Sequence, residues 1–343
     1  IQTGRLQPGR MFVADLDEGR IISDEELKRK IVTQAPYCTW LKQNTVKIDE
    51  LPVATNKTYN YDKSSLMQRQ IAFGMTHEDL KLTIAPMAKD KKEPIGSMGA
   101  DNPLAVFSSQ SQHLSNYFKQ QFAQVSNPPI DSIRELHIMS LFTSVSRTYN
   151  ILCESSLHSK QITFKQPVLA IEEVEKIRQI SHSDFRVKQI NATFPATGEA
   201  GALEKALDAM CKDVDRAILD FAANILIISD RNMSSENAPI PMLLAVGAIH
   251  NHLTNNGLRV RVGIVVETGD ARETHHFATL IGYGANVINP YLTFETIASL
   301  GEQGYLPHDL DIEKANYNFT HAVGEGLLKI FSKMGISTLQ SYR

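Results

Sequence analysis

The chain has 343 residues, of which 42% are hydrophobic and 21% are charged. These values exclude an intrinsically disordered chain and leave room for one large domain or two smaller ones. The formal net charge of −3 predicts no nucleic-acid partner. Because no apolar stretch reaches about 18 residues, we expect no membrane partner either.

The three cysteines are sparse and far apart, at Cys38, Cys153 and Cys211. Such a set argues against a disulfide framework and against a cysteine-ligated metal, and it favours a reducing, cytoplasmic compartment. The chain opens with Ile-Gln-Thr-Gly-Arg rather than with Met and a basic signal segment. We therefore expect its first residue to be a boundary within a longer polypeptide.

Residues 1–50 predict a small N-terminal α/β unit. Arg10–Asp15 and Ile21–Ile22 are typical of short strands, and Ser23 is a suitable N-cap for a helix over Asp24–Thr33. Two short strands and one helix bury little apolar surface, so this unit should lean on a missing or neighbouring domain.

Residues 51–160 are less regular, and Asp131 is the clearest helix cap among them. Pro128 disfavours helical geometry at the residue before it, so a helix that precedes it should stop there. The expected elements are helices at Leu66–Phe73, Glu78–Met87, His113–Gln124 and Ser132–Phe142, and a strand at Leu104–Phe107.

From about residue 161 strands and helices alternate. The expected strands are Gln161–Phe164, Phe185–Phe194, Asn224–Ser229, Arg259–Glu267, Asn286–Asn289 and Ile336–Leu339. The expected helices are Ala170–Gln179, Glu199–Ala222, Ile240–Asn255, Asp270–Tyr283, Leu292–Leu300 and Asp311–Met334. This alternation predicts an α/β fold with a parallel sheet. A partial or degenerate (β/α)8 (TIM-like) barrel fits slightly better than an open doubly wound sheet, and both remain open.

Charged residues follow the ends of the expected parallel strands, where the sites of α/β folds lie. They are Asp230, Arg231, Glu267, Asp270 and Arg272. One interpretation is an acid–base or anion site with an arginine clamp. The favoured interpretation is a structural Asp–Arg network in which Asp270 caps its own helix.

Histidine and glycine motifs do not add a site. His250 and His252, and the adjacent His275 and His276, fall on expected helices at spacings that do not share one face, which favours core or rim histidines over a metal site. The glycine pairs lack the spacing of a dinucleotide fingerprint. The residues alone therefore indicate an α/β domain without a recognisable active site, and we expect no catalytic, cofactor-binding or metal-binding residue.

Long segments nevertheless resemble the large subunit of glutamate synthase. Gly4–Phe12 and Glu18–Glu26 are similar to the end of its glutamine amidotransferase domain. Pro94–Ala105, Tyr117–Asp131 and Arg259–Thr296 are similar to its central domain, and Lys329–Arg343 to the start of its FMN synthase domain. The resemblance divides the chain into an amidotransferase remnant and connector (1–50), a central α/β domain (51–310) and a helix leading to the FMN domain (311–343).

This resemblance implies that the parent enzyme makes glutamate from glutamine and 2-oxoglutarate with FMN and an iron–sulfur cluster. Its partners would be the amidotransferase and FMN synthase domains of the same chain, with a small subunit or ferredoxin in the holoenzyme. The central domain would be a degenerate FMN-type barrel without a cofactor, a non-catalytic scaffold between two active sites. No catalytic residue of the family carries over to these positions.

The resemblance also motivates a hypothesis about ammonia transfer, namely that Val125–Asp131 walls the ammonia tunnel. Ser126, Asn127, Pro128 and Asp131 are the candidates for this tunnel or a domain interface. The alternative is a helix-terminating loop in such an interface. Two rival functions remain: an independent barrel enzyme that uses the rim of Asp230, Arg231, Glu267 and Asp270, and an interaction module outside glutamate synthesis.

Overall fold

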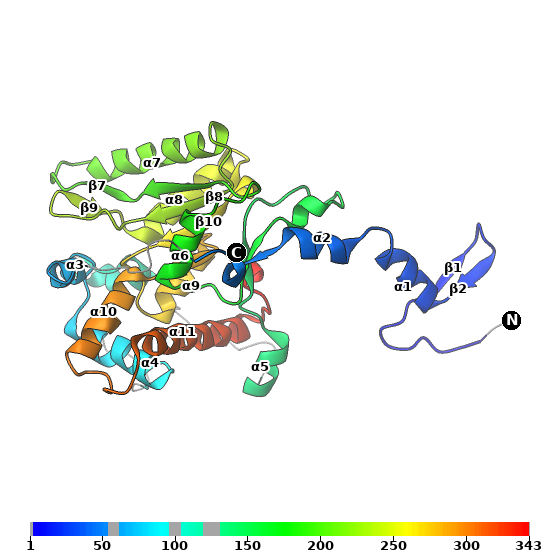
Figure 1. Cartoon of the computed structure of the whole chain (residues 1–343), viewed down its shortest axis with the longest axis horizontal. Coiled ribbons are helices and arrows are strands. Elements are labelled where there is room, and N and C mark those ends of the chain that lie inside the picture. Colours follow the sequence, from blue (N-terminus) through cyan, green and yellow to red (C-terminus); the bar gives the residue numbers. More distant parts are fainter. Residues whose placement is uncertain (1–2, 54–61, 96–103, 119–130, 343) are drawn as a thin grey trace.

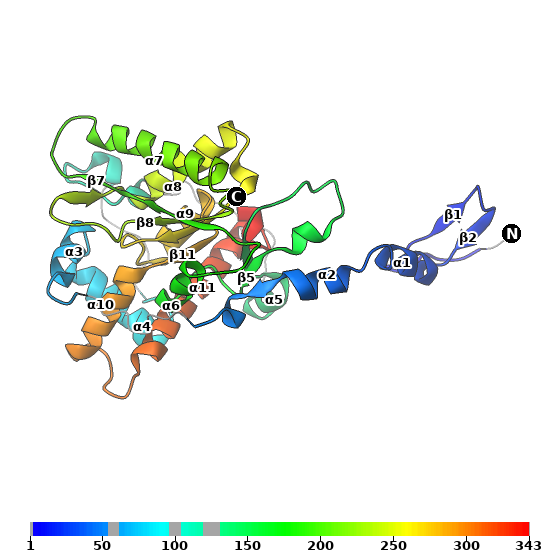
Figure 2. The same cartoon turned by 45° about the horizontal axis from the view of Figure 1, so that its top comes forward.

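The computed structural model describes residues 3–53, 62–95, 104–118 and 131–342, and it confirms the α/β class. A compact body carries a parallel sheet surrounded by helices, and a narrow N-terminal arm projects from it (Figures 1 and 2). The helices are α1 (Asp24–Val32), α2 (Tyr37–Asn44), α3 (Leu66–Ala72), α4 (Ala85–Asp90), α5 (Ser132–Ile138), α6 (Ile171–Arg178), α7 (Ala202–Leu219), α8 (Met242–Asn255), α9 (Thr274–Gly282), α10 (Tyr291–Glu302) and α11 (Ile312–Met334).

In the part of the chain that the structure describes, the strands form four small sheets. They are β1 (Val13–Asp15), β2 (Arg20–Ile22), β3 (Val46–Lys47), β4 (Thr143–Val145), β5 (Ile162–Phe164), β6 (Val187–Asn191), β7 (Thr193–Pro195), β8 (Ile225–Ser229), β9 (Asn237–Pro239), β10 (Gly263–Glu267) and β11 (Val287–Asn289). The largest sheet has the order β11-β10-β8-β6, and all of its strands are parallel.

A short segment extends this sheet beyond β11. The N–H of Leu169 donates to the carbonyl of Ile288 at 2.9 Å, and the N–H of Ile288 donates to the carbonyl of Pro167 at 2.7 Å. Helix α6 follows this segment and leads to β6 at the opposite edge of the sheet.

The two faces of the large sheet bury different sets of side chains, because successive residues of a strand point to opposite faces. On one face, Leu226, Ile228 and Ile264 pack in one cluster with residues of α7, α8, α9 and α11. On the other face, Ile225 and Ile227 pack in a second cluster with residues of α6, β4 and β5. Burial on both faces explains why these strands read as continuous apolar runs.

Helix α11 is the longest helix and confirms the helix expected at Asp311–Met334. Asp311 is its N-cap, and Gly335 ends it in the left-handed conformation that favours glycine (φ 69°). Its buried face packs against α9, α10 and α4. The side chain of Asn318 donates to the carbonyl of Ala88 in α4 at 2.9 Å, which fixes α4 on this helix.

The N-terminal arm consists of the β1–β2 hairpin and α1 (Figure 1). Both expected strands and the expected helix are confirmed here, and the hydroxyl of Ser23 accepts from the N–H of Glu26 as the N-cap. Apolar side chains of the arm are exposed, among them Phe12 and Leu16. Helix α2, which was not predicted, connects the arm to the body.

Three expected elements differ from the structure. Leu104–Phe107 was expected as a strand, and its residues Ala105–Phe107 form a 3-10 turn. His113–Gln124 was expected as a helix; Leu114–Tyr117 form a single 3-10 turn, termed η4, and 119–124 lie outside the described residues. Ile336–Leu339 was expected as a strand, but it contributes only one bridge, between Thr338 and Ser140. Short apolar runs do not by themselves specify a strand ladder.

Two longer strands were expected with the wrong extent. Phe185–Phe194 divides into β6 and β7, which belong to different sheets. The N–H of Ala192 still donates to the carbonyl of Ser229 in β8, but the carbonyl of Ala192 accepts from the N–H of Ile240, and the residues that follow pair with β9 instead. Arg259–Arg261 form a 3-10 turn before β10. Among the described residues, no helix has the length and apolarity needed to cross a membrane.

Candidate functional site

Polar side chains form one row across the carboxyl end of the large sheet. Glu267 lies opposite Ser229 on one side and Asn289 on the other, and Asn191 lies opposite Ser229. Ser229, Glu267 and Asn289 are buried. Because this end of a parallel sheet is where α/β proteins place their sites, this row is the candidate site.

Glu267 is held by three donors. The hydroxyl of Ser229 donates to its carboxylate at 2.6 Å, the Nε of Arg231 at 2.6 Å and the Nη2 of Arg178 at 2.7 Å. The guanidinium of Arg231 also lies over the ring of Tyr291, 4.5 Å from its centroid. A buried carboxylate satisfied by two guanidinium groups and a hydroxyl serves as a structural hub rather than as an acid or base for a substrate.

Asp230 is fully buried and holds the loop that follows β10. Its carboxylate accepts from the hydroxyl of Thr268 at 2.5 Å and from the N–H of Gly269 at 3.1 Å. Burial raises the pKa of Asp230 to about 8. The nearby charge of Asp270 adds to this rise, and the hydrogen bonds to the carboxylate act to lower the pKa. The side chain therefore resists ionisation near neutral pH.

Asp270 caps a neighbouring helix and not its own, which corrects the expectation from sequence. Its carboxylate accepts from the N–H of Met242, the first residue of α8, at 2.9 Å. The residue before Met242 is Pro241, whose side chain offers no cap, so Asp270 supplies the missing acceptor. Burial acts to raise the pKa of Asp270, but the contacts with His113, the N–H of Met242 and His276 together lower it.

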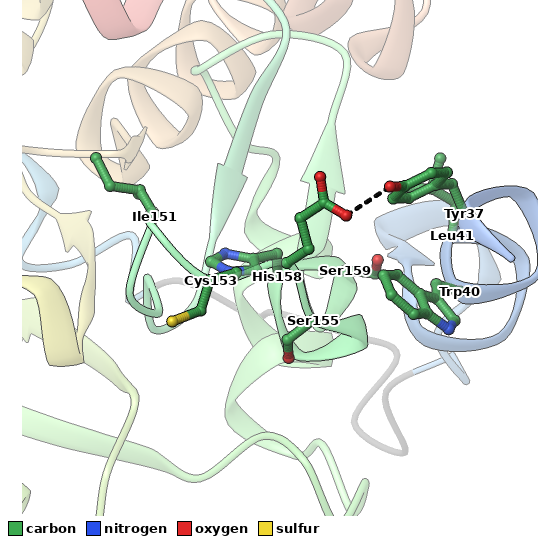
Figure 3. A pocket seen from close by; sticks show the side chains of 9 residues that line it. Tyr37, Trp40, Leu41, Ile151, Cys153, Ser155, His158 and Ser159 are labelled. Atoms are coloured by element: carbon green, nitrogen blue, oxygen red, sulfur yellow. Dashed lines mark hydrogen bonds between the residues drawn. The ribbon is translucent and has the colours of Figure 1, made fainter. Parts of the chain in front are cut away.

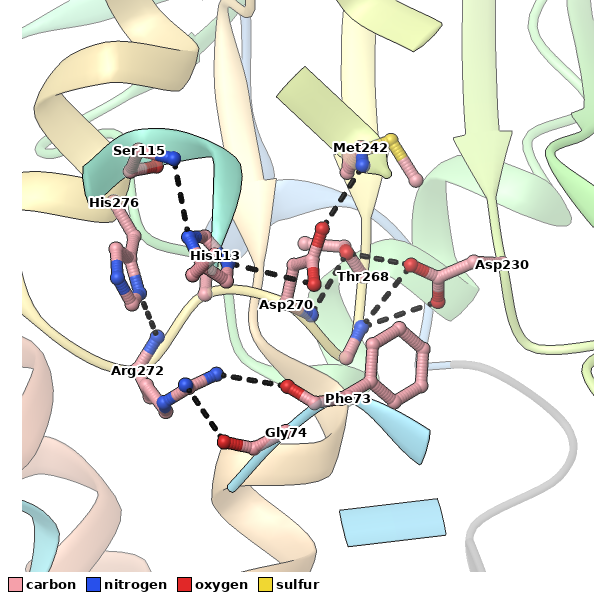
Figure 4. Close-up of polar contacts among 12 residues, drawn as sticks. Phe73, Gly74, His113, Ser115, Asp230, Met242, Thr268, Asp270, Arg272 and His276 are labelled. Atoms are coloured by element: carbon pink, nitrogen blue, oxygen red, sulfur yellow. Dashed lines mark hydrogen bonds and ion pairs between the residues drawn. The ribbon is translucent and has the colours of Figure 1, made fainter. Parts of the chain in front are cut away.

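Arg272 closes the sheet end with the chain that follows α3 (Figure 4). Its guanidinium donates to the carbonyls of Phe73 at 3.2 Å and Gly74 at 3.1 Å, and its Nε lies 3.2 Å from the carboxylate of Asp79. The ring of Phe73 packs on Gly269 so closely that a Cβ there would lie 2.5 Å from it. Arg272 is therefore a structural clamp and not an open anion site.

The five charged residues singled out in the sequence thus gather at one end of the sheet. Of the five, Arg231 and Glu267 pair with each other, and the other three are held by residues from elsewhere in the chain. The partners that sequence reasoning missed are Arg178, Phe73, Asp79 and Tyr291, which come from other parts of the chain and carry no local signal. Among the described residues at this end, the guanidinium groups already contact carboxylates or carbonyls, so they do not fit the phosphate of a flavin.

The histidines have separate partners. His252 contacts Asp215 at 2.9 Å, and the Nε of Arg259 donates to His250 at 3.1 Å. His275 donates to the carbonyl of Ser115 at 2.9 Å, and His276 lies 3.1 Å from Glu273. Within the described ranges, no three side chains of the metal-ligating types gather into a site.

A surface hollow of about 370 Å³ lies between α2 and the loop before β5 (Figure 3). Tyr37 and Trp40 line it from α2, and His158 lines it from the loop. The hydroxyl of Tyr37 donates to the carboxylate of Glu154 at 2.6 Å across this junction. The hollow therefore marks the place where the arm is tied to the body.

The residues predicted to wall the tunnel are only partly described. Ser126, Asn127 and Pro128 lie outside the described residues. Asp131 is exposed, and its carboxylate accepts from the N–H groups of Ile133 at 3.0 Å and Arg134 at 2.9 Å. Asp131 is therefore the N-terminal cap of α5, as expected from the sequence.

Comparison with known proteins decides the family. Residues 68–343 match the family model of the glutamate synthase central domain. The chain belongs to the glutamate synthase family. Residues 1–40 match the class-II glutamine amidotransferase model, in agreement with the resemblance at the N-terminus.

Glutamate synthase relatives align along nearly the whole chain. The NADPH-type large chain of Bacillus subtilis is 44% identical over 99% of this chain and 22% of its own length. The NADH-type enzyme of Schizosaccharomyces pombe is 38% identical over 100% of this chain and 17% of its own length. The ferredoxin-dependent chloroplast enzyme of Oryza sativa is 41% identical over 100% of this chain and 22% of its own length. The chain thus spans about a fifth of the length of these relatives.

The similarity to solved structures is much weaker. A flavocytochrome b2 variant with sulfite bound has a TM-score of 0.33 and 13% identity, and it covers 52% of this chain and 38% of its own. This similarity carries no argument about fold or function.

Proposed function

We propose that this chain is the central scaffold of a glutamate synthase that makes glutamate from glutamine and 2-oxoglutarate. In this role it holds a glutaminase site and an FMN synthase site in register and forms no bonds itself. The observation that carries the proposal is the closed sheet end in a chain of this family. Glu267 is satisfied by two arginines, and Arg272 clamps the chain after α3 over the strand ends.

The cofactors and partners of the proposal belong to the longer enzyme. FMN and the iron–sulfur cluster would be bound by its synthase domain. Electrons would come from a small subunit or from ferredoxin, since relatives of both the pyridine-nucleotide and the ferredoxin types match. The domain limits 1–50, 51–310 and 311–343 stay part of this proposal, as does a cytoplasmic location.

We also propose that the large sheet is a section of a degenerate (β/α)8 barrel. Successive strands β6, β8, β10 and β11 are parallel neighbours in chain order, and residues of α7, α8 and α9 pack on the same face. A parallel neighbour on the open edge of β6, in an experimental structure of the longer enzyme, would support the barrel. A free edge at β6 would indicate an open sheet instead, an arrangement in which α6, whose residues pack on the second face, would cover that face.

A clamp variant tests the scaffold role. In the full-length enzyme, Arg272→Met should reduce glutamine-dependent glutamate formation several-fold more than ammonia-dependent formation, because only the former requires the two sites to stay in register. Arg216→Met, at an exposed arginine of α7, is the matched control. Equal losses in both assays, or no loss, would contradict the proposal, and so would flavin binding or turnover by the purified 343-residue chain.

The tunnel role of Ser126, Asn127, Pro128 and Asp131 is a further part of the proposal, and its support is the family resemblance of this segment. Replacing Asn127 with Ala in the full-length enzyme should lower glutamine-dependent activity and spare ammonia-dependent activity. Asn232→Ala, at an exposed amide, is the control. If both activities of the Asn127 variant change together, the segment does not guide ammonia.

A further inference from the structure

Two histidine rings stack beside the closed sheet end. His113 precedes the η4 turn and His276 lies in α9, and their ring centroids are 4.1 Å apart with an angle of 22° between the planes. The side chain of His276 is only 4% exposed and that of His113 only 13%. The pair therefore joins the turn to the helix inside the protein (Figure 4).

Hydrogen bonds fix the tautomer of both rings. The Nδ1 of His113 accepts from the N–H of Ser115 at 3.3 Å, and the Nδ1 of His276 accepts from the N–H of Arg272 at 3.3 Å. Each Nε2 then carries the proton and points to a carboxylate, Asp270 at 3.5 Å for His113 and Glu273 at 3.1 Å for His276. Both rings thus use Nδ1 as an acceptor and Nε2 as a donor, which is the arrangement of a neutral imidazole.

A second proton has no acceptable place on either ring. It would bind Nδ1, which already faces a backbone N–H donor, so two donors would meet and the hydrogen bond would break. Charging both stacked rings would also set two cations about 4 Å apart. Burial lowers the pKa of His276, which also disfavours a second proton on this ring, although the contact with Glu273 acts to raise the pKa.

The turn depends on these rings because it docks through Ser115. Ser115 is buried: its N–H donates to His113, its carbonyl accepts from His275, and its hydroxyl lies 3.1 Å from that of Thr279. Protonation of His275 would leave its bond intact, because its Nε2 is already the donor. Loss of the His113 bond would instead remove the cap of the η4 turn.

The charges around the stacked pair act on its protonation in opposite directions. The charged and titratable groups that face the stacked pair are Asp270, Glu273, Arg272 and His275, with Asp79 behind Arg272, Asp230 behind Asp270, and Glu93 on the side chain of Thr274. The carboxylates favour a charged ring and Arg272 opposes it. The Nδ1 atoms add to the effect of Arg272, because each already faces a backbone N–H donor.

We propose that the stacked pair His113–His276 is an acid-sensitive latch, which holds the turn Leu114–Tyr117 on α9 at neutral pH and releases it when either ring is protonated. The latch ties a loop of the central domain to the loop that closes the sheet end. It does not depend on the scaffold role proposed above, since it follows from the hydrogen bonds of the chain itself.

Hydrogen exchange of the 343-residue chain between pH 8 and pH 5, corrected for the intrinsic pH dependence, tests the latch. Protection of the peptide spanning 113–118 should fall about tenfold per pH unit below the transition, as uptake of one proton requires. Protection of a reference peptide in β8 should stay constant. Unchanged protection at 113–118, or equal loss in β8, would overturn the proposal.

Non-titrating variants complete the test. In His113→Asn the amide oxygen can still cap the turn, and in His276→Gln the side chain can still accept from Arg272 and donate to Glu273. Because protonation of either ring releases the turn, the variant that carries both substitutions should keep the turn protected at pH 5. His275→Gln, the matched control, should retain the acid transition. If the double variant loses protection at the same pH as the unmodified chain, the histidines are not the latch.

Discussion

Arg178 and Arg231 set the character of the sheet end at the scale of single residues. Both guanidinium groups bind Glu267, and Arg231 also covers the ring of Tyr291. Removing one partner from such a buried group leaves an uncompensated charge, so the pairs constrain one another. Asp230 differs because its hydrogen bonds come from neutral donors, Thr268 and Gly269.

Asp230 should make stability depend on pH. Burial raises its pKa from 3.8 to about 8, so the folded chain retains a proton that the unfolded chain releases above pH 4. Stability therefore falls as the pH rises from about 4 to 8. Asp230→Asn mimics the protonated form, so the free energy of unfolding of the unmodified chain, relative to this variant, should fall by about 2 kcal/mol between pH 5 and pH 7.

Urea denaturation at several pH values measures this difference. Asp309→Asn, at an exposed aspartate, is the control and should follow the unmodified chain across the whole range. Parallel stability curves for Asp230→Asn and the unmodified chain would show that the carboxyl is ionised in the folded protein throughout.

Local sequence revealed which residues approach the sheet end but not what they do there. Asp230, Arg231, Glu267, Asp270 and Arg272 were identified because each follows a parallel strand. The roles depended on distant residues: Arg272 binds the carbonyls after α3, almost 200 positions away, and Asp270 caps α8 because Pro241 cannot. Such partners are set by packing, and no spacing in the sequence encodes them.

At the scale of elements, the contact between α3 and the loop after β10 closes the sheet end. Gly269 permits it, because any larger residue would place its Cβ against the ring of Phe73. Glycine is therefore required at this position by close approach rather than by an unusual backbone angle.

Gly269→Ala should lower the free energy of unfolding by about 1–3 kcal/mol, since the ring must move or the loop must shift. The same substitution should cost less in a Phe73→Ala background, where the ring is absent, and a double-mutant cycle measures this coupling. Gly4→Ala is the control, because a Cβ added at Gly4 would meet no atom within 4 Å. Equal costs in both backgrounds would show that the ring does not require this glycine.

Long periodic elements were predicted well, and short ones were not. Helix α11 and strand β8 match their expected ranges within two residues, because each carries a strong apolar pattern and clear end signals. Leu104–Phe107 and Ile336–Leu339 failed as strands because a four-residue segment suits a turn as well as a ladder. Tertiary contacts decide such segments.

At the scale of the whole molecule, the arm and the body are almost independent. Hydrogen bonds of residues 3–33 that involve side chains stay within the arm, such as that of Lys28 with the carbonyl of Gly9. Contact with the body begins at Tyr37, which binds Glu154, and continues at Thr45, which donates to the carbonyl of Ser159. The arm therefore adds little to the stability of the body.

Deletion of residues 1–32 should change the melting temperature of the body by less than about 2 °C, because few contacts are lost. Calorimetry of the shortened chain measures this. A deletion that extends through Leu41 is the comparison, and it should lower the melting temperature clearly, since it removes the side chains of Tyr37 and Trp40 at the junction. A large decrease after the shorter deletion would show that the arm packs on the body.

The clamp of Arg272 has a consequence for how freely this protein can vary. Its guanidinium binds main-chain carbonyls of Phe73 and Gly74, and every amino acid supplies a carbonyl. Substitutions along the exposed side of α3 can therefore accumulate without loosening the contact between Arg272 and the chain that follows α3, provided that the arginine itself is retained.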